Sequence, residues 1–287
     1  MRKKRTFIAA ITAFAATIAA ATFVITAPDA SAYTDGIFRV TCGFSHSAPD
    51  DPIVHPNKPG ASHLHDFFGN AGTRASSTYD SLIGVRSTCP NKDTSAYWVP
   101  AVYQNGKKLT PWYLTAYYIS PVNDHSKIQA WPKDFRMIVG DAKNTDVSKV
   151  DGFIRWGCTD NTAFGKTPPA SCPKAGAIQV RIEFPACWDG VIAPNGAENK
   201  AGHMRYPSGN KCPKGYDHVL PTMRMNIGYQ TGVNTGNITL SSGSVASIHA
   251  DFLNSWDQPT LENLVRDCLR AAKTCDRFQG TTPGRNP

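Results

Sequence analysis

Alternating apolar and polar residues run along much of the chain in short segments. In residues 37–47, every second side chain from Phe38 to His46 shares one face, while Arg39, Thr41 and Ser45 take the other. Successive side chains of a strand point to opposite faces of its sheet. The segment therefore predicts one half-buried strand.

Similar patterns predict further strands, with Gly, Pro, Asn and Asp in the gaps. Asn105-Gly106 lies between two of them and is a two-residue hairpin signal. The predicted strands span residues 97–104, 107–119, 135–139, 153–156, 177–184, 223–229 and 244–252. Strands do not alternate with helices, so a doubly wound parallel sheet is not expected. The fold class predicted is mainly β, an antiparallel β-sandwich or jelly-roll-like single domain with one C-terminal helix.

That helix is predicted by apolar residues at helical spacing near the C-terminus. Asp257 can cap its first turn, which also contains Pro259. The periodic positions are Leu261, Leu264, Val265, Cys268 and Leu269. The helix is expected to pack on a sheet face or edge.

The N-terminus is typical of a secretory signal peptide. Four basic residues at 2–5 precede an apolar run from Phe7 to about Ala27, and Ala30-Ser31-Ala32 supplies a small-residue cleavage site. We expect a signal peptide at 1–32, a single secreted domain at 33–280 and a frayed tail at 281–287. The alternative is an uncleaved membrane anchor, because the apolar run is long for a signal core. After cleavage we expect a secreted, extracellular protein with no stable membrane insertion.

All eight cysteines follow the leader, and an even number in a secreted chain indicates disulfides. Seven residues of unbroken helix would separate Cys268 from Cys275 by about 10 Å, which is too far for a disulfide. If these two residues pair, the helix must end near Ala272. Proximity along the chain predicts the pairs Cys42–Cys89, Cys158–Cys172, Cys187–Cys212 and Cys268–Cys275.

Charge and aromatic content narrow the classes of binding partner that we expect. The formal net charge is +8, but no Lys/Arg run follows the leader, so we expect no nucleic acid partner. Six tryptophans and ten tyrosines could offer flat platforms to sugar rings, which favours an extracellular or cell-wall carbohydrate partner. The alternative is that a β-sandwich simply buries its tryptophans.

The strongest chemical signal is a pair of polar side chains two residues apart, which occurs twice. His63 and His65 share a face if residues 62–70 are extended, and His249 and Asp251 share a face in the same way. We predict that the two segments meet in one pocket. These four side chains are the predicted metal ligands, and histidine ligands favour Zn or Cu as the cofactor.

Two more residues, His203 and Tyr206, are predicted at the edge of this site, so that six residues form the predicted catalytic set. A metal-free alternative uses the same histidines as general acid and base, assisted by Tyr206 or Asp66. His46 fits better as a hydrogen-bonded structural histidine.

Two function classes follow. The first is a His-centred enzyme, metal-dependent or metal-free, that acts on extracellular or cell-wall polysaccharide. The second is a non-catalytic carbohydrate- or cell-wall-binding protein with structural histidines. No G-x-S-x-G, Walker, H-E-x-x-H or Rossmann motif is present. The enzyme classes that usually carry these signature motifs are therefore not indicated.

Several motifs together resemble DUF1996, a family of secreted bacterial and fungal proteins of unknown function. They are DPIV at 51–54, SHLHDFFGN at 62–70, SAYWVP at 95–100, FRMIVGD at 135–141, CWDG at 187–190, GHMRYP at 202–207, HVLP at 218–221 and HADFLNSWD at 249–257. The sequence has Ser255 where the family pattern has glycine. The resemblance implies a secreted protein, implies no particular reaction, and agrees with the choice of the histidine segments.

Overall fold

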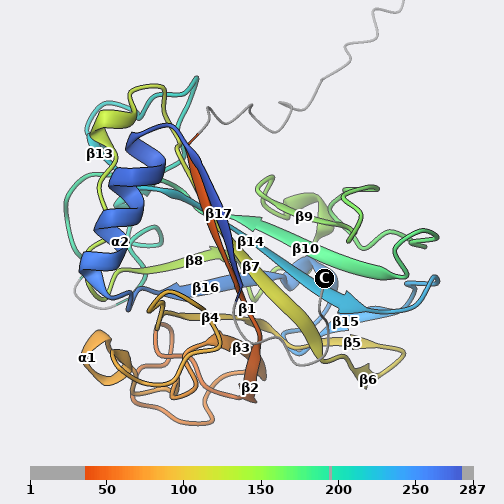
Figure 1. Cartoon of the computed structure of the whole chain (residues 1–287). Helices are drawn as coiled ribbons and strands as arrows, with labels where there is room; N and C mark the ends of the chain where they lie inside the picture. The colour runs from red at the N-terminus through yellow and green to blue at the C-terminus, as the bar shows by residue number, and fades with distance from the viewer. Residues whose placement is uncertain (1–35, 194–195, 280–287) are drawn as a thin grey trace, which may run out of the picture. The chain divides into compact units, whose positions relative to one another are not determined.

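The computed structural model of the chain describes residues 36–193 and 196–279 (Figure 1). Strand makes up 37% of the chain and helix 11%, which confirms the prediction of a mainly β fold. The predicted leader at 1–32 and the predicted tail at 281–287 lie outside the described residues.

Most strands belong to two large sheets, whose strands cross each other in Figure 1. The six-stranded sheet contains β1 (Ile37–Cys42), β7 (Pro111–Ile119), β9 (Ile154–Cys158), β10 (Ala177–Glu183), β14 (Thr222–Gln230) and β17 (Thr274–Gln279), in the order β17-β1-β7-β14-β10-β9. The five-stranded sheet contains β2 (Phe44–Ala48), β3 (His65–Gly69), β4 (Ala96–Pro100), β8 (Arg136–Gly140) and β16 (His249–Leu253), in the order β2-β3-β4-β16-β8. Neighbouring strands are antiparallel, except that β17 runs parallel to β1.

Two three-stranded sheets complete the β structure. One contains β11 (Cys187–Trp188), β12 (Met204–Arg205) and β13 (His218–Val219). The other contains β5 (Val102–Gln104), β6 (Lys107–Lys108) and β15 (Ile238–Leu240). The remaining short helical segments are α1 (Tyr79–Leu82) and single turns at His125–Lys127, Val147–Lys149 and Val245–Ser247.

The main core lies between the two large sheets. Phe38 and Tyr118 of the six-stranded sheet stack at 4.5 Å, and Tyr97 and Phe252 of the five-stranded sheet lie 5.2 Å apart. The hydroxyls of Tyr97 and Tyr118 join the sheets at 2.6 Å. All four side chains are fully buried and belong to one apolar cluster, as the predicted sandwich requires.

Four predicted strands differ in their bounds. The segment 107–119 divides into β6 and β7, which pair in different sheets. The segment 37–47 is two strands, because the chain turns at Gly43 and the halves pair in different sheets. The segment 97–104 divides at Ala101 for the same reason, and the segment 244–252 becomes a strand only at His249. Alternation continues through a turn between sheets, so the pattern alone cannot reveal these breaks.

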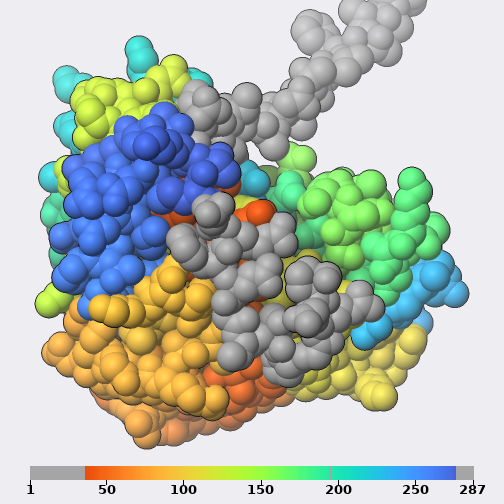
Figure 2. Space-filling model, in the orientation of Figure 1, coloured from red at the N-terminus to blue at the C-terminus, as the bar shows by residue number. Residues whose placement is uncertain are grey.

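Local turn and cap signals are confirmed. Asn105 and Gly106 have φ of 51° and 76°, as a primed hairpin turn requires. The Asp257 carboxylate accepts from the Thr260 N–H and starts α2 (Gln258–Leu264), which continues as a π-helix at Val265–Arg270. In Figure 2 the blue C-terminal helix lies against the orange segment near residue 90, where Asp257 N donates to Lys92 O at 3.2 Å.

All four predicted disulfides are present, and the described residues include no free cysteine. The helix ends before Ala272, whose φ is 51°, and the Cα atoms of Cys268 and Cys275 are then 5.7 Å apart. Within the described residues, no helix has both the length and the apolar character needed to cross a membrane.

Candidate metal centre

The candidate centre lies on the outer face of the five-stranded sheet, opposite the main core. On β16, Ala250 and Phe252 belong to the main core, so the side chains that alternate with them, His249 and Asp251, point to the other face. On β3 the same alternation separates Phe68 in the core from His65 on the outer face. Loops cover this face, so the polar side chains on it are buried.

Three histidine rings meet there. The Nε2 atom of His249 lies 3.2 Å from Nε2 of His63 and 3.3 Å from Nε2 of His65. His65 is fully buried and His249 is 3% exposed, whereas His63, which precedes β3, is half-buried. The structure thus brings the two predicted segments together although 184 residues separate His65 from His249 along the chain.

Backbone carbonyls determine how the two buried rings present their nitrogens. His65 Nδ1 lies 3.0 Å from Asp50 O, and His249 Nδ1 lies 2.8 Å from Ser247 O. Because a carbonyl oxygen only accepts hydrogen bonds, both Nδ1 atoms carry the proton in the neutral ring. The Nε2 lone pairs of His65 and His249 therefore face each other with no proton between them.

Burial keeps these rings neutral. It lowers the pKa of His249 to about 4, although the hydrogen bond to Ser247 opposes this shift. Burial, and then the charges that His249 and His63 would carry, hold the pKa of His65 well below its usual range. The pKa of His63 is also lowered, mainly by burial. At pH 7 all three rings are available as neutral ligands.

Two carboxyl groups complete the cluster. Asp251 is fully buried, and neither of its oxygens has a hydrogen-bond partner among the described residues. Its Oδ2 lies 3.9 Å from His249 Nε2. Asp51 is buried beside it, and its Oδ1 accepts from the N–H groups of Ile53 and Val54 at 2.8 Å. Burial raises the pKa of both carboxyls, and the Asp51 charge raises that of Asp251 further.

The donor set fits a transition metal ion. The ligand atoms of His63, His65 and His249 all lie within 4.8 Å of one another, and so do those of Asp51, His65 and Asp251. In a tetrahedral zinc site with Zn–N distances of about 2.0–2.1 Å, two nitrogens lie about 3.3–3.4 Å apart. The observed Nε2 separations are close to this value. Isolated buried acceptors and carboxylates are unfavourable, and a cation would compensate them.

A comparison with known families matches both histidine segments to one family. The sequence model of a domain of unknown function, DUF1996, matches residues 51–256. The chain belongs to the DUF1996 family. The matched region includes all five residues of the cluster. No curated protein and no solved structure matches the chain.

Two residues predicted for this DUF1996 site have other partners. His203 Nδ1 pairs with Asp189 Oδ2 at 2.9 Å, beside β12. Tyr206 donates to Glu183 O at 2.8 Å and stacks on Phe153 at 3.5 Å. Tyr206 lines a cavity of about 240 Å³ that also includes Gly140, the cross-strand partner of His249.

Asp66 and His46, which were also considered in the sequence, have structural roles. Asp66, the alternative assistant in a metal-free site, points away from His65 and pairs with Lys108 at 2.7 Å and with the Ser47 hydroxyl at 2.6 Å. His46 Nε2 bonds to Thr73 O at 3.0 Å, and its ring stacks on Phe67. The structural interpretation of His46 therefore agrees with its contacts.

Sequence reasoning missed Asp51 as a member of the cluster. Asp51 lies in the DPIV motif that supported the family resemblance, which was the only available signal. Its position depends on the proline-rich loop that follows it. Sequence reasoning also missed Lys200, whose Nζ donates to Gly140 O at 2.6 Å and whose charge acts on both His249 and Asp251.

Proposed function

We propose that this DUF1996 protein is a secreted metalloenzyme that acts on extracellular or cell-wall polysaccharide, with its metal held by His63, His65, His249 and Asp251. One observation carries the metal proposal. Nε2 of His249 lies within 3.3 Å of Nε2 of both His63 and His65, and 3.9 Å from the fully buried Asp251 carboxylate, which has no hydrogen-bond partner among the described residues. The Nδ1–H groups of His65 and His249 donate to the carbonyls of Asp50 and Ser247, so neither neutral ring has a second proton to offer to this group.

Each residue has a distinct part in this proposal. His65 and His249 offer Nε2 and are oriented through Nδ1, a common arrangement for metal ligands. Asp251 supplies negative charge, and Asp51 lies behind it as a second carboxyl held by two backbone N–H groups. Imidazole ligands suit zinc or copper. When bound, such an ion polarises an oxygen of a ligand or acidifies a bound water.

The half-buried His63 favours an active centre over a purely structural one. His65, His249 and Asp251 are buried, so His63 is the cluster histidine that solvent reaches. Structural zinc sites are usually closed by four protein ligands, whereas catalytic sites keep one position for water or substrate. Secretion is supported by the four disulfides, which are typical of proteins folded in an oxidising compartment.

The non-catalytic alternative has less support. A flat sugar-binding platform needs exposed aromatic faces, but five of the six tryptophans are buried. Trp98, Trp131, Trp156 and Trp256 are fully buried, and Trp188 is 8% exposed. The tryptophans therefore serve mainly as core, and an enzyme with a pocket fits the structure better than a tryptophan platform.

Metal analysis of the purified protein tests the proposal. We expect about one equivalent of zinc or copper in the wild type and less than a tenth of that in His249→Ala. His125→Ala, in a turn outside the cluster, is the matched control and should keep the metal. A polysaccharide activity screen with and without chelator then tests the enzyme. Wild-type protein that takes up neither ion after reconstitution would rule out the metal, and chelator-insensitive turnover would rule out a metal-dependent reaction.

A further inference from the structure

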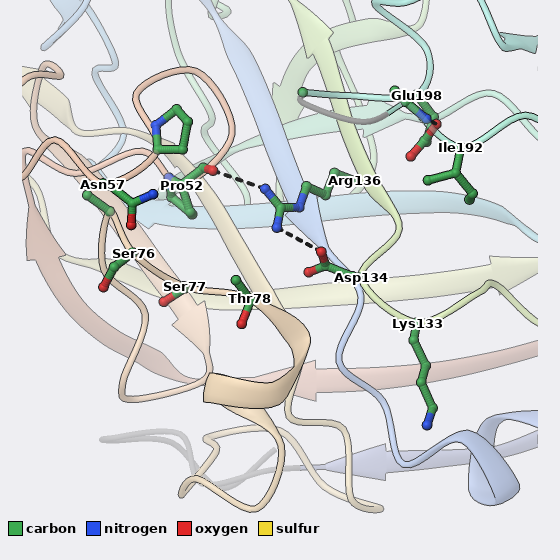
Figure 3. Close-up of a pocket in the computed structure, with 14 residues that line it drawn as sticks. Pro52, Asn57, Ser76, Ser77, Thr78, Lys133, Asp134, Arg136, Ile192 and Glu198 are labelled. Atoms are coloured by element: carbon green, nitrogen blue, oxygen red, sulfur yellow. Dashed lines mark hydrogen bonds and ion pairs between the residues drawn. The ribbon is translucent and has the colours of Figure 1, made fainter.

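A cavity of about 300 Å³ opens on the same loop-covered side of the five-stranded sheet as the cluster (Figure 3). Its lining includes Pro52, Asn57, Ser76, Asp134, Arg136 and Glu198. Pro52 directly follows Asp51. Arg136 points to the same face of β8 as Ile138, which is the cross-strand partner of Asp251. The cavity and the metal centre therefore share a sheet face and a loop.

We propose that this cavity, called here the Arg136 pocket, binds a sugar unit of a neutral polysaccharide. That the ligand is a polysaccharide rests on the proposed function. The position of the binding site and the absence of charge on its ligand are inferred from the residues that line the pocket. At about 300 Å³ the pocket is at the lower end of the size range of small-ligand sites, which suits a single short stretch of a glycan.

The charges that line the pocket balance. Two cations, Lys133 and Arg136, accompany two acids, Asp134 and Glu198. Arg136 pairs with Asp134 at 2.8 Å, and Figure 3 shows its guanidinium between that carboxylate and Pro52 O, at 3.3 Å. A lining with no excess of either charge offers no net attraction to an anionic or cationic ligand. A neutral ligand rich in hydroxyls can use these donors and acceptors without leaving a charge unpaired.

The lining also has the mixed character that sugar rings require. Ser76, Thr78 and Asn57 are exposed and offer hydroxyls and an amide, while Glu198 is only 2% exposed and contributes a nearly buried carboxyl group. Ile192, which is 49% exposed, forms an apolar part of the rim. Hydroxyl edges and C–H faces of a sugar ring thus both have counterparts here.

The walls of the pocket are held in place before any ligand binds. Asn57 N donates to Ala75 O at 2.8 Å, and Tyr79 N donates to Asp134 Oδ1 at 2.9 Å. On the opposite wall, Glu198 N donates to Arg136 O at 2.8 Å. Such preorganisation reduces the entropy lost on binding. The pocket can therefore bind a weakly interacting ligand such as a glycan.

Binding of neutral hexasaccharides tests the inference. We would titrate cellohexaose, laminarihexaose, chitohexaose, xylohexaose and mannohexaose into the full mature protein and record heteronuclear NMR shifts, with hexagalacturonate as the acidic comparison. We expect at least one neutral glycan to bind and to shift the amides of residues 53–55, 57 and 76–78. Binding of none of them, shifts confined to other regions, or tighter binding of hexagalacturonate would overturn the proposal.

Variants then locate the binding. Ser76→Trp adds a large ring at an exposed position of the rim and should weaken binding at least tenfold. Ser126→Trp is the matched control at an exposed serine outside the pocket and should change the affinity less than twofold. Glu198→Gln keeps the shape and removes the charge, and should weaken binding about tenfold, the effect of losing a hydrogen bond to a charged group.

The two proposals fail separately. Ser76→Trp should keep a full equivalent of metal, and His249→Ala should keep the glycan affinity. A protein without metal that still binds glycan in a Ser76-dependent way would retire the metal centre alone. A metal-loaded protein whose glycan binding is unchanged by Ser76→Trp would retire the Arg136 pocket alone.

Discussion

Two buried polar groups of residues lie on opposite sides of the five-stranded sheet, and they differ in their hydrogen-bond donors. On the inner side, Trp256 Nε1 donates to the Tyr118 hydroxyl at 2.9 Å, and the two tyrosine hydroxyls of Tyr118 and Tyr97 are 2.6 Å apart. Tyr97 then donates to Asp93 Oδ2 at 2.6 Å, and Ser95 N donates to Oδ1 at 3.0 Å. This inner network satisfies its one carboxylate with donors of its own.

The outer cluster has acceptors in excess. The two Nδ1–H groups of His65 and His249 are used on backbone carbonyls, and the Asp251 carboxylate has no donor among the described residues. Burial of an unpartnered carboxylate is unfavourable by several kcal/mol unless it takes up a proton or meets a cation. Burial alone therefore does not identify a site. A polar cluster that lacks its own donors does.

Chelation should produce the largest contrast between the two regions. A metal present at about a thousand times its dissociation constant stabilises the fold by about 4 kcal/mol, which corresponds to roughly 8–16 °C in Tm for a chain of this size. We expect calorimetry to show such a fall after chelation and recovery on adding zinc or copper. An unchanged Tm would mean that the outer cluster is satisfied without an ion.

Acid should affect the two regions of the metal-free protein in opposite directions. The pKa of His249 is lowered to about 4, so between pH 6.5 and 4 the unfolded chain binds a proton that the folded chain does not, and the free energy of unfolding falls. The pKa of Asp93 is raised to about 6 by burial, so below pH 6 the folded chain binds the proton first and stability rises. Each effect is at most about 3 kcal/mol.

Urea unfolding between pH 4 and 7 measures these opposite slopes. The His249→Gln variant should lose less stability on acidification than the metal-free wild type, and Asp93→Asn should lose more. Equal slopes in all three proteins would show that neither buried group changes its pKa on folding.

Tyr97→Phe should disrupt the inner network without affecting metal binding. The change removes the donor to Asp93 and the partner of Tyr118, at a cost of about 2 kcal/mol. We expect a Tm lower by several degrees and an unchanged metal content. Loss of metal in this variant would show that the two sides of the sheet are coupled.

Asp251→Val should have the smallest effect on stability and the opposite sign. In chelated protein it replaces an unpartnered buried carboxyl group with an apolar side chain and should stabilise the fold by about 1 kcal/mol. In the presence of metal it should instead remove a ligand, so metal binding weakens. Asp251→Asn is the matched control that keeps the shape. Destabilisation of the chelated Asp251→Val protein would indicate that the carboxylate has partners of its own.

Much of this fold follows from local signals. Strand alternation, the Asn105-Gly106 turn, the Asp257 cap and the proximity of cysteine pairs depend on neighbours in the sequence. The breaks at Gly43 and Ala101 do not, because they arise where the chain passes between sheets. Alternation through a turn looks the same as alternation along one strand.

The candidate site also has residues that a local pattern predicts and residues that it does not. His63, His65, His249 and Asp251 could be selected because a period of two predicts a shared face. This period survives in β16, whereas His63 precedes β3 and its ring reaches that of His65 from the preceding loop. Asp51 could not be selected, because only the folded loop brings it beside Asp251. His203 and Tyr206 were chosen from a motif without such a period, and the contacts that the structure gives them are with Asp189, Glu183 and Phe153.

Anomalous X-ray diffraction at the zinc and copper absorption edges would locate the proposed metal ion itself. Crystals of protein purified without chelator and reconstituted with each ion should show one strong peak bonded to Nε2 of His63, His65 and His249. The Asp251 carboxylate should lie beside it. No peak at this position in reconstituted crystals, with the three rings and Asp251 hydrogen-bonded to ordered water instead, would contradict the metal centre.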